Sequence, residues 1–203
     1  MAFVLLHESN DFNMPRLAIF ASGNGSNAQR IVEYFDSHPT ITINLILSNN
    51  PDAYVLTRAK KLGVPAMAFN RSTFKETDNI PALLKATNID YLVLAGFLWL
   101  IPRNILLAYP GRIINIHPAL LPKYGGKGMF GMKVHEAVIA AGDPESGITI
   151  HNVDEHYDEG RIIFQARCTV SAHDTPATLA EKVHQLEYRY FPEIIEKFVT
   201  GSQ

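Results

Sequence analysis

The chain has almost no cysteine and no marked excess of either charge. Cys168 is the single cysteine among 203 residues, so an internal disulfide is excluded and a reducing compartment is favoured. It lies in a stretch that alternates apolar and polar residues, which predicts a buried structural thiol. A formal net charge of -2 provides no broad basic face for a nucleic acid or an anionic membrane. We therefore expect a cytoplasmic protein with small-molecule substrates and neither of those partners.

Long apolar runs are also missing. None approaches the roughly 18 residues that a membrane span needs. The short run from Phe3 to Leu6 has no basic start and no cleavage-like site, so it is not typical of a signal peptide. Met14 stands directly before the first strand-like segment. We expect residues 1–14 to be a disordered extension or an upstream start, with translation beginning at Met1 or Met14, and residues 15–203 to form a single domain.

Short apolar runs alternate with segments of helical periodicity along the chain. The strand-like runs are Leu17 to Ala21, Ile41 to Leu47, Ala66 to Phe69, Tyr91 to Ala95, Ile113 to Ile116, Gly147 to Val153 and Ile162 to Val170. The helical segments are Ala28 to Phe35, Tyr54 to Leu62, Ile80 to Thr87, Pro102 to Ala108 and a last one from Pro176 to Phe198. This order predicts an α/β, Rossmann-like fold with a mainly parallel twisted sheet of about seven strands, helices on both faces and an antiparallel element near the C-terminal end.

A glycine turn follows the first predicted strand and precedes the first predicted helix. Gly23, Gly25 and Ala28 satisfy the loose dinucleotide-binding pattern, but the second strand ends in Ser and Asn rather than in the ribose-binding Asp or Glu. The free amides at the helix start, with Ser26 and Asn27, suit one phosphate monoester instead. The alternative is a helix N-cap formed by Ser or Asn.

Asn115 and His117 flank one residue at the end of a predicted buried strand, so both side chains point to the same side. A carboxamide can stabilise an oxyanion and an imidazole can act as acid or base, which together suit attack at a carbonyl carbon. The alternative is a strand end with a merely structural histidine.

The segment after the next predicted strand supplies four acids that could orient His117. They are Asp154, Glu155, Asp158 and Glu159, and their spacing does not choose among them. A solvated charged turn is the alternative for this segment. His117, His151 and His156 could form a metal site with these acids, but no metal-binding spacing is present and we expect no metal.

Four motifs, FASGNGSN, LAGFLWLIP, INIHPALLPKYGG and GITIHNVDEHYDEG, together resemble the folate-dependent phosphoribosylglycinamide formyltransferases, in the same order. The resemblance runs from Leu17 to about Phe198. It implies transfer of a formyl group from 10-formyltetrahydrofolate, the co-substrate, to the amine of glycinamide ribonucleotide in purine biosynthesis. It also implies that the family's catalytic residues correspond to Asn115, His117 and Asp158.

The resemblance further assigns the binding residues. Those for the ribonucleotide are Gly25, Ser26, Asn27, Pro118, His184 and Glu187, of which Glu187 would hold the ribose hydroxyls unless it is a surface salt-bridge partner. Those for the folate are Leu98, Trp99, Leu100, Ile101, Asn115, Val153, Asp154, Glu155, His156, Tyr157 and Asp158, with ordinary core as the alternative for the apolar ones.

This chain departs from the family's pattern in several places. Trp99 replaces a frequent arginine, and His184 replaces a frequent glutamine. The stretch from Gly125 to Gly131 is longer than usual, either as a lid over the site or as an inserted turn. Arg71 and Lys75 are candidates for the folate glutamate tail. We expect a monomer or a homodimer.

Three alternatives to this function remain. A formyltetrahydrofolate hydrolase and a methionyl-tRNA or amino-sugar formyltransferase share the Asn, His and Asp core. The hydrolases and the tRNA enzymes add a further domain that we do not expect here. A non-catalytic nucleotide-binding module would leave the three polar residues unexplained.

Overall fold

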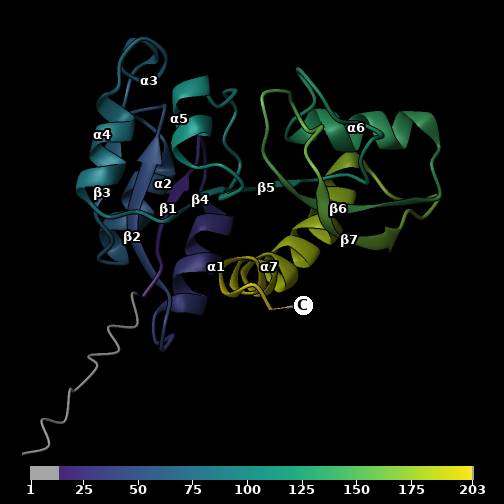
Figure 1. The fold of residues 1–203 in the computed structure, drawn as a ribbon. Coiled ribbons are helices and arrows are strands. Elements are labelled where there is room, and N and C mark those ends of the chain that lie inside the picture. The colour runs from purple at the N-terminus through teal and green to yellow at the C-terminus, as the bar shows by residue number, and fades with distance from the viewer. Residues whose placement is uncertain (1–13, 203) are drawn as a thin grey trace, which may run out of the picture.

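The computed structural model describes residues 14–202, so the predicted extension lies outside the described residues apart from Met14. Figure 1 shows a twisted sheet with helices packed against it. The strands are β1 (Arg16–Phe20), β2 (Thr42–Ser48), β3 (Ala66–Ala68), β4 (Tyr91–Leu94), β5 (Ile113–His117), β6 (Glu145–Asn152) and β7 (Ile162–Thr169). The helices are α1 (Ser26–Phe35), α2 (Tyr54–Lys61), α3 (Arg71–Lys75), α4 (Asn79–Ala86), α5 (Arg103–Ala108), α6 (Met132–Ala141) and α7 (Pro176–Thr200).

Within these residues the strands form one seven-stranded sheet in the order β3-β2-β1-β4-β5-β6-β7. The first five strands pair in parallel, whereas β6 runs antiparallel to β5 and β7 antiparallel to β6. The predicted fold class is therefore confirmed. The order reverses between β1 and β4, which is the kind of switch point where α/β sheets place their ligands.

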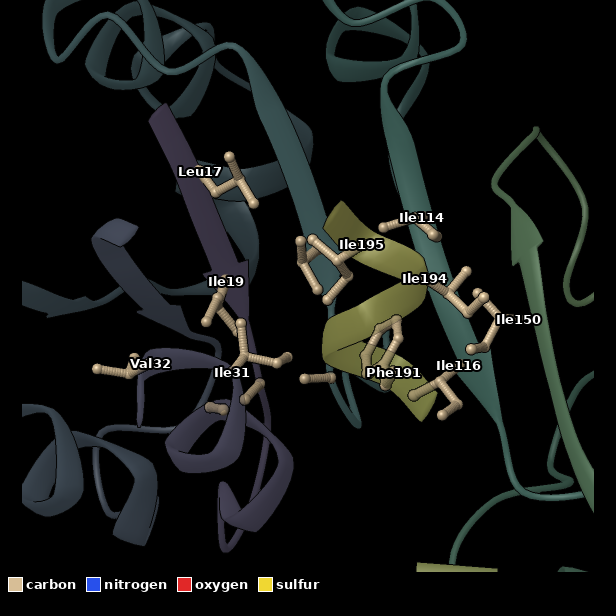
Figure 2. Packing of buried hydrophobic residues seen from close by; sticks show 14 of the residues in the cluster. Leu17, Ile19, Ile31, Val32, Ile114, Ile116, Ile150, Phe191, Ile194 and Ile195 are labelled. Carbon is tan, nitrogen blue, oxygen red and sulfur yellow. The ribbon is translucent and has the colours of Figure 1, made fainter. Parts of the chain in front are cut away.

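The sheet buries side chains on both faces because its central strands are apolar throughout. In β1, Leu17 and Ile19 join a cluster with α1 and α7, while Ala18 and Phe20 join a second cluster with α3, α4 and α5. Figure 2 shows the first cluster, where Phe191 of α7 lies close to Ile116 of β5. Both faces of β1 are thus covered by packed side chains, and the glycine turn directly follows this buried strand.

Helix α7 is the longest helix and closes the first cluster. It begins after Thr175, whose hydroxyl accepts from the Thr178 amide while the Thr178 hydroxyl accepts from the Thr175 amide, a capping box strengthened by Pro176. Along its buried face lie the following residues: Leu179, Ala180, Val183, Glu187, Phe191, Pro192, Ile194, Ile195 and Val199. Leu186, Tyr190 and Phe198 are partly buried at the border of this face.

The sequence missed two helices. Helix α3 has only five residues, beginning after Asn70, whose side chain accepts from the Thr73 amide. Helix α6 follows the glycine-rich loop directly, and its buried side chains, Val134, His135 and Val138, are too few to give a strong apolar stripe. Cys168 is half-buried rather than buried, because β7 is an edge strand with one exposed face.

Candidate functional site

A cavity of about 590 Å³ lies at the carboxyl ends of the parallel strands, a volume typical of small-molecule sites. Its lining combines the ends of β4 and β5, the start of α1, the loop before α6, the loop after β6 and the inner face of α7. The lining residues are Asn27, Gly96, Phe97, Leu98, Asn115, Ile116, His117, Pro118, Gly126, Lys127, Gly128, Met129, Phe130, Gly131, Met132, His135, Tyr157, Asp158, Ala180, His184 and Glu187.

His117, at the end of β5, is 4% exposed and is held from two sides. Its Nε2 donates to the carbonyl oxygen of Tyr124 at 2.7 Å, and its Nδ1 lies 3.4 Å from Oδ2 of Asp158. Burial lowers the pKa of His117, although the Asp158 charge and the Tyr124 carbonyl oppose this shift. The neutral ring therefore carries its proton on Nε2, and an imidazolium would satisfy both acceptors.

Asp158 is the one acid of the predicted four that meets His117. Its Oδ2 accepts from the Gly126 amide at 2.9 Å, and its backbone has φ 59°, which a residue with a side chain rarely adopts. Burial raises the pKa of Asp158, but His151, His117 and the Gly126 amide outweigh this and hold it below its usual value. Asp158 is thus a carboxylate at neutral pH.

His151 completes this group, and the sequence interpretation considered it only as a metal ligand. It lies on β6 directly opposite Asn115 in the antiparallel register. Its Nδ1 donates to the carbonyl of Asn152 at 2.7 Å, so in the neutral ring Nε2 is an acceptor for the Asn115 amide at 3.0 Å. Its Nε2 also lies 3.6 Å from Oδ1 of Asp158. His151 therefore sets which way the Asn115 carboxamide points, a role visible only once the pairing register is known.

The glycine turn opens the other end of the cavity. Gly25 precedes α1 with φ 76°, and a Cβ there would lie 2.4 Å from Cγ2 of Val55, so glycine is required. No side chain caps α1, contrary to the predicted alternative of a Ser or Asn N-cap, and the first amides are free. Asn27 lines the cavity, whereas Gly25 and Ser26 are not among its lining residues.

Glu187 faces this turn from α7 and is 6% exposed, so the predicted alternative of a surface salt-bridge partner is wrong. Its Oε2 accepts from Nδ2 of Asn27 at 2.9 Å, while Oδ1 of Asn27 has no partner among the described residues. Burial raises the pKa of Glu187, with the Asn27 amide and His184 opposing it. The cavity thus has a buried carboxylate and an unused carbonyl oxygen at this end.

His135 on α6 also faces this end and was missed by the sequence interpretation. It is 2% exposed, and its Nδ1 has no hydrogen-bond partner within residues 14–202. Burial, then the proximity of His184 and His117, lowers its pKa to about 4. The sequence around His135 did not indicate a site, because a single histidine on a largely apolar helix is typical of a helix core.

The residues predicted for the folate separate into two groups. Leu98, Asn115, Tyr157 and Asp158 line the cavity, whereas Trp99, Leu100, Ile101, Val153, Asp154, Glu155 and His156 are not among its lining residues. Trp99 packs on Phe69 and Phe74 and lies under the guanidinium of Arg71, and Ile101 is core. Trp99 and Ile101 therefore fit the predicted alternative of ordinary hydrophobic core.

The glycine-rich loop runs along the cavity. The stretch Gly126–Gly131 lines it together with Met132, and Phe130 is exposed at its rim. The loop therefore lies beside the site, and its role as a lid or as an inserted turn stays a prediction. No cluster of three or more metal-ligating side chains is found in residues 14–202. Over the same residues no helix is long and apolar enough to cross a membrane.

The chain belongs to the formyl transferase family, whose model matches residues 15–195.

Within that family, the similar proteins are phosphoribosylglycinamide formyltransferases. The chloroplastic protein of Arabidopsis thaliana is 39% identical over 193 residues, which are 92% of this chain and 66% of the relative, so this chain spans about two thirds of that relative's length. The Bacillus subtilis protein is 35% identical over 92% of this chain and 95% of its own. The crystal structure of the Streptococcus pneumoniae protein gives a TM-score of 0.80 at 39% identity, covering 92% of this chain and 99% of that one.

Proposed function

We propose that this chain transfers a formyl group from 10-formyltetrahydrofolate to the amine of glycinamide ribonucleotide, giving formylglycinamide ribonucleotide for purine biosynthesis. The observation that carries the proposal is the convergence of Asn115, His117 and Asp158 on one cavity that also reaches Asn27 at the start of α1. The relatives named above support the choice of substrates.

The ribonucleotide would bind at the end formed by α1 and α7. Its phosphate would accept from the free amides that follow Gly25, at the positive end of the α1 dipole. The ribose hydroxyls would donate to the buried Glu187 carboxylate and to Oδ1 of Asn27, which lacks a partner. His184 and Pro118 line the same region.

The formyl carbon would lie at the end formed by β5 and the loop after β6. Attack by the neutral amine forms the new C–N bond and moves the carbonyl electron pair onto oxygen. One N–H of Asn115 is held by His151, so the other is free to donate to this oxyanion. A single well-placed donor of this kind contributes roughly 10²–10³ to the rate.

His117 and Asp158 would handle the charge and the proton. The Tyr124 carbonyl and the Asp158 carboxylate both favour the imidazolium, while burial opposes it. The imidazolium form of His117 would stabilise the negative charge that develops on the formyl oxygen. Asp158 holds it and helps to move the proton from the amine to N10 of the folate, whose bond to the formyl carbon breaks and whose electron pair takes that proton.

The folate would occupy the side of the cavity next to Leu98 and Tyr157. The Leu98 amide is already taken by the hydroxyl of Ser22, which fixes the loop after β4. The backbone of the segment after β6, from Val153 to Tyr157, would wrap the pterin ring. The glutamate tail would leave toward Arg71 and Lys75 on α3.

A two-substrate turnover assay tests this function. Purified protein should convert glycinamide ribonucleotide only with 10-formyltetrahydrofolate present and without added metal. Release of formate at the same rate with and without the amine would favour the hydrolase alternative instead. Absence of turnover together with ribonucleotide binding would favour a binding module.

A further inference from the structure

The loop between β5 and α6 makes two main-chain hydrogen bonds to the proposed catalytic pair. The Tyr124 carbonyl accepts from Nε2 of His117 at 2.7 Å, and the Gly126 amide donates to Oδ2 of Asp158 at 2.9 Å. Between them, a Cβ at Gly125 would lie 3.3 Å from Cβ of Asp158 and 2.5 Å from the Leu121 side chain. These three residues therefore press against His117 and Asp158 through backbone atoms.

Tyr124 adopts an intrinsically unfavourable backbone conformation. Its φ is 57°, in the left-handed region, which is unfavourable for a residue with a side chain. Such a conformation persists only where surrounding contacts hold it. Because the carbonyl that meets His117 belongs to this same residue, whatever holds Tyr124 also aims that carbonyl.

The contact that holds Tyr124 lies outside the active cavity. The Tyr124 hydroxyl donates to Oδ2 of Asp143 at 2.8 Å, and its ring packs against the core cluster on the α7 side. Asp143 follows the end of α6 and its amide donates to the Val138 carbonyl, so its position is set by the helix. The Tyr124 hydroxyl, followed by the Lys123 ammonium, holds the pKa of Asp143 below its usual value.

Asp143 and the Tyr124 hydroxyl are not placed to touch a substrate. Both residues line a separate cavity of about 340 Å³ and neither lines the 590 Å³ cavity. Lys123 also reaches Asp143, at 3.0 and 3.2 Å, but its side chain is 67% exposed, and such surface pairs contribute little.

We propose that the Tyr124–Asp143 hydrogen bond is a positioning contact, which holds His117 and Asp158 in their reactive arrangement through the backbone of Tyr124 to Gly126. This inference rests on the proposed roles of His117 and Asp158. Neither Tyr124 nor Asp143 is a catalytic residue in it.

The test is a set of variants measured for kcat, for both KM values and for melting temperature. Tyr124→Phe keeps the ring and removes the hydroxyl, and Asp143→Ala removes the acceptor. Each should lower kcat roughly tenfold, because small displacements of catalytic groups are costly, while both KM values stay within about twofold. The double variant should be no slower than either single one, because all three lack the same bond.

Two further variants serve as controls. Asp143→Asn keeps an oxygen that can accept from the tyrosine hydroxyl, so it should recover most of the lost kcat. Lys123→Met leaves the Tyr124–Asp143 bond intact and should retain near-normal kcat. A structural role alone would lower the melting temperature and leave kcat of the folded protein unchanged.

The outcomes separate this inference from the proposed function. Normal kcat in Tyr124→Phe with an inactive His117→Ala protein overturns the positioning role and leaves the catalytic one standing. Near-normal kcat in His117→Ala overturns the catalytic role itself. Additive losses in the double variant would show that Tyr124 and Asp143 act separately and would also overturn the inference.

Discussion

The two ends of the cavity differ in whether their polar side chains are hydrogen-bonded to other protein groups. At the formyl-transfer end, Asn115, His117, His151 and Asp158 are joined to one another and to backbone groups. At the ribonucleotide end, Asn27 and His135 each keep a buried atom without a partner among residues 14–202, and a buried carboxylate faces them.

Under the proposed function, this difference corresponds to two tasks of the cavity. Groups that act on a transition state must be held in place before the substrate arrives, since reorganising them during the reaction would raise the barrier. Groups that recognise a ligand gain from being desolvated and unpaired, because the correct ligand then supplies the missing hydrogen bonds.

The first test of this difference between the two ends concerns the formyl-transfer end. His117→Ala should lower kcat by roughly 10³-fold with ribonucleotide affinity nearly unchanged, because the ring acts on the transition state. Steady-state kinetics and direct titration of the ribonucleotide measure the two effects. His173→Ala, at an exposed position before α7, is the matched control. A parallel loss of affinity would show that the two ends are not separate in function.

A second effect concerns the pH dependence of stability at the ribonucleotide end. Burial lowers the pKa of His135 from 6.5 to about 4, so the unfolded chain binds this proton more tightly than the folded one. The contribution of His135 to the free energy of unfolding is therefore fully present above pH 6.5 and is lost as the pH falls toward 4. The loss should reach up to about 3 kcal/mol, and denaturant unfolding at several pH values measures it.

His135→Gln should flatten that pH dependence, whereas His173→Gln should leave it unchanged because His173 is exposed. The buried His117 contributes in the same direction in all three proteins, so the difference between variants isolates His135. An unchanged slope in His135→Gln would show that folding does not shift the pKa of this histidine.

A third test removes the unpaired amide oxygen. Asn27→Ala should raise the KM for the ribonucleotide about tenfold while kcat changes little, because a hydrogen bond to a ligand is lost away from the reacting atoms. Asn44→Ala on β2, distant from the lining residues, is the control. An unchanged KM would argue that the turn is structural only.

The smallest effect is a gain in stability. Glu187→Gln removes an acid whose pKa is raised by burial, so ionisation of Glu187 opposes folding. The variant should melt higher by about 2–4 °C if the gain is near 1 kcal/mol, and should bind the ribonucleotide less tightly. Calorimetry and titration measure both. A variant that melts lower would place Glu187 among the groups that stabilise the free fold.

Much of the fold followed from local patterns. Each predicted strand and helix was a run of neighbouring residues with its own periodicity, and the five parallel strands, the antiparallel end and the glycine turn are confirmed. The failures were short or weakly patterned segments. Helix α3 has five residues, and α6 buries only three, so neither carried a clear stripe.

The sequence by itself determined which residues end strand β5 and which begin helix α1, because these are matters of local order. It placed Asn115 and His117 on one side and supplied four acids without choosing among them. The family resemblance had named Asp158, but only the tertiary structure brought it to His117, set His151 opposite Asn115, buried Glu187 against Asn27 and joined Tyr124 to Asp143. The physical reason is that these pairings depend on strand register and helix packing between residues far apart in the chain.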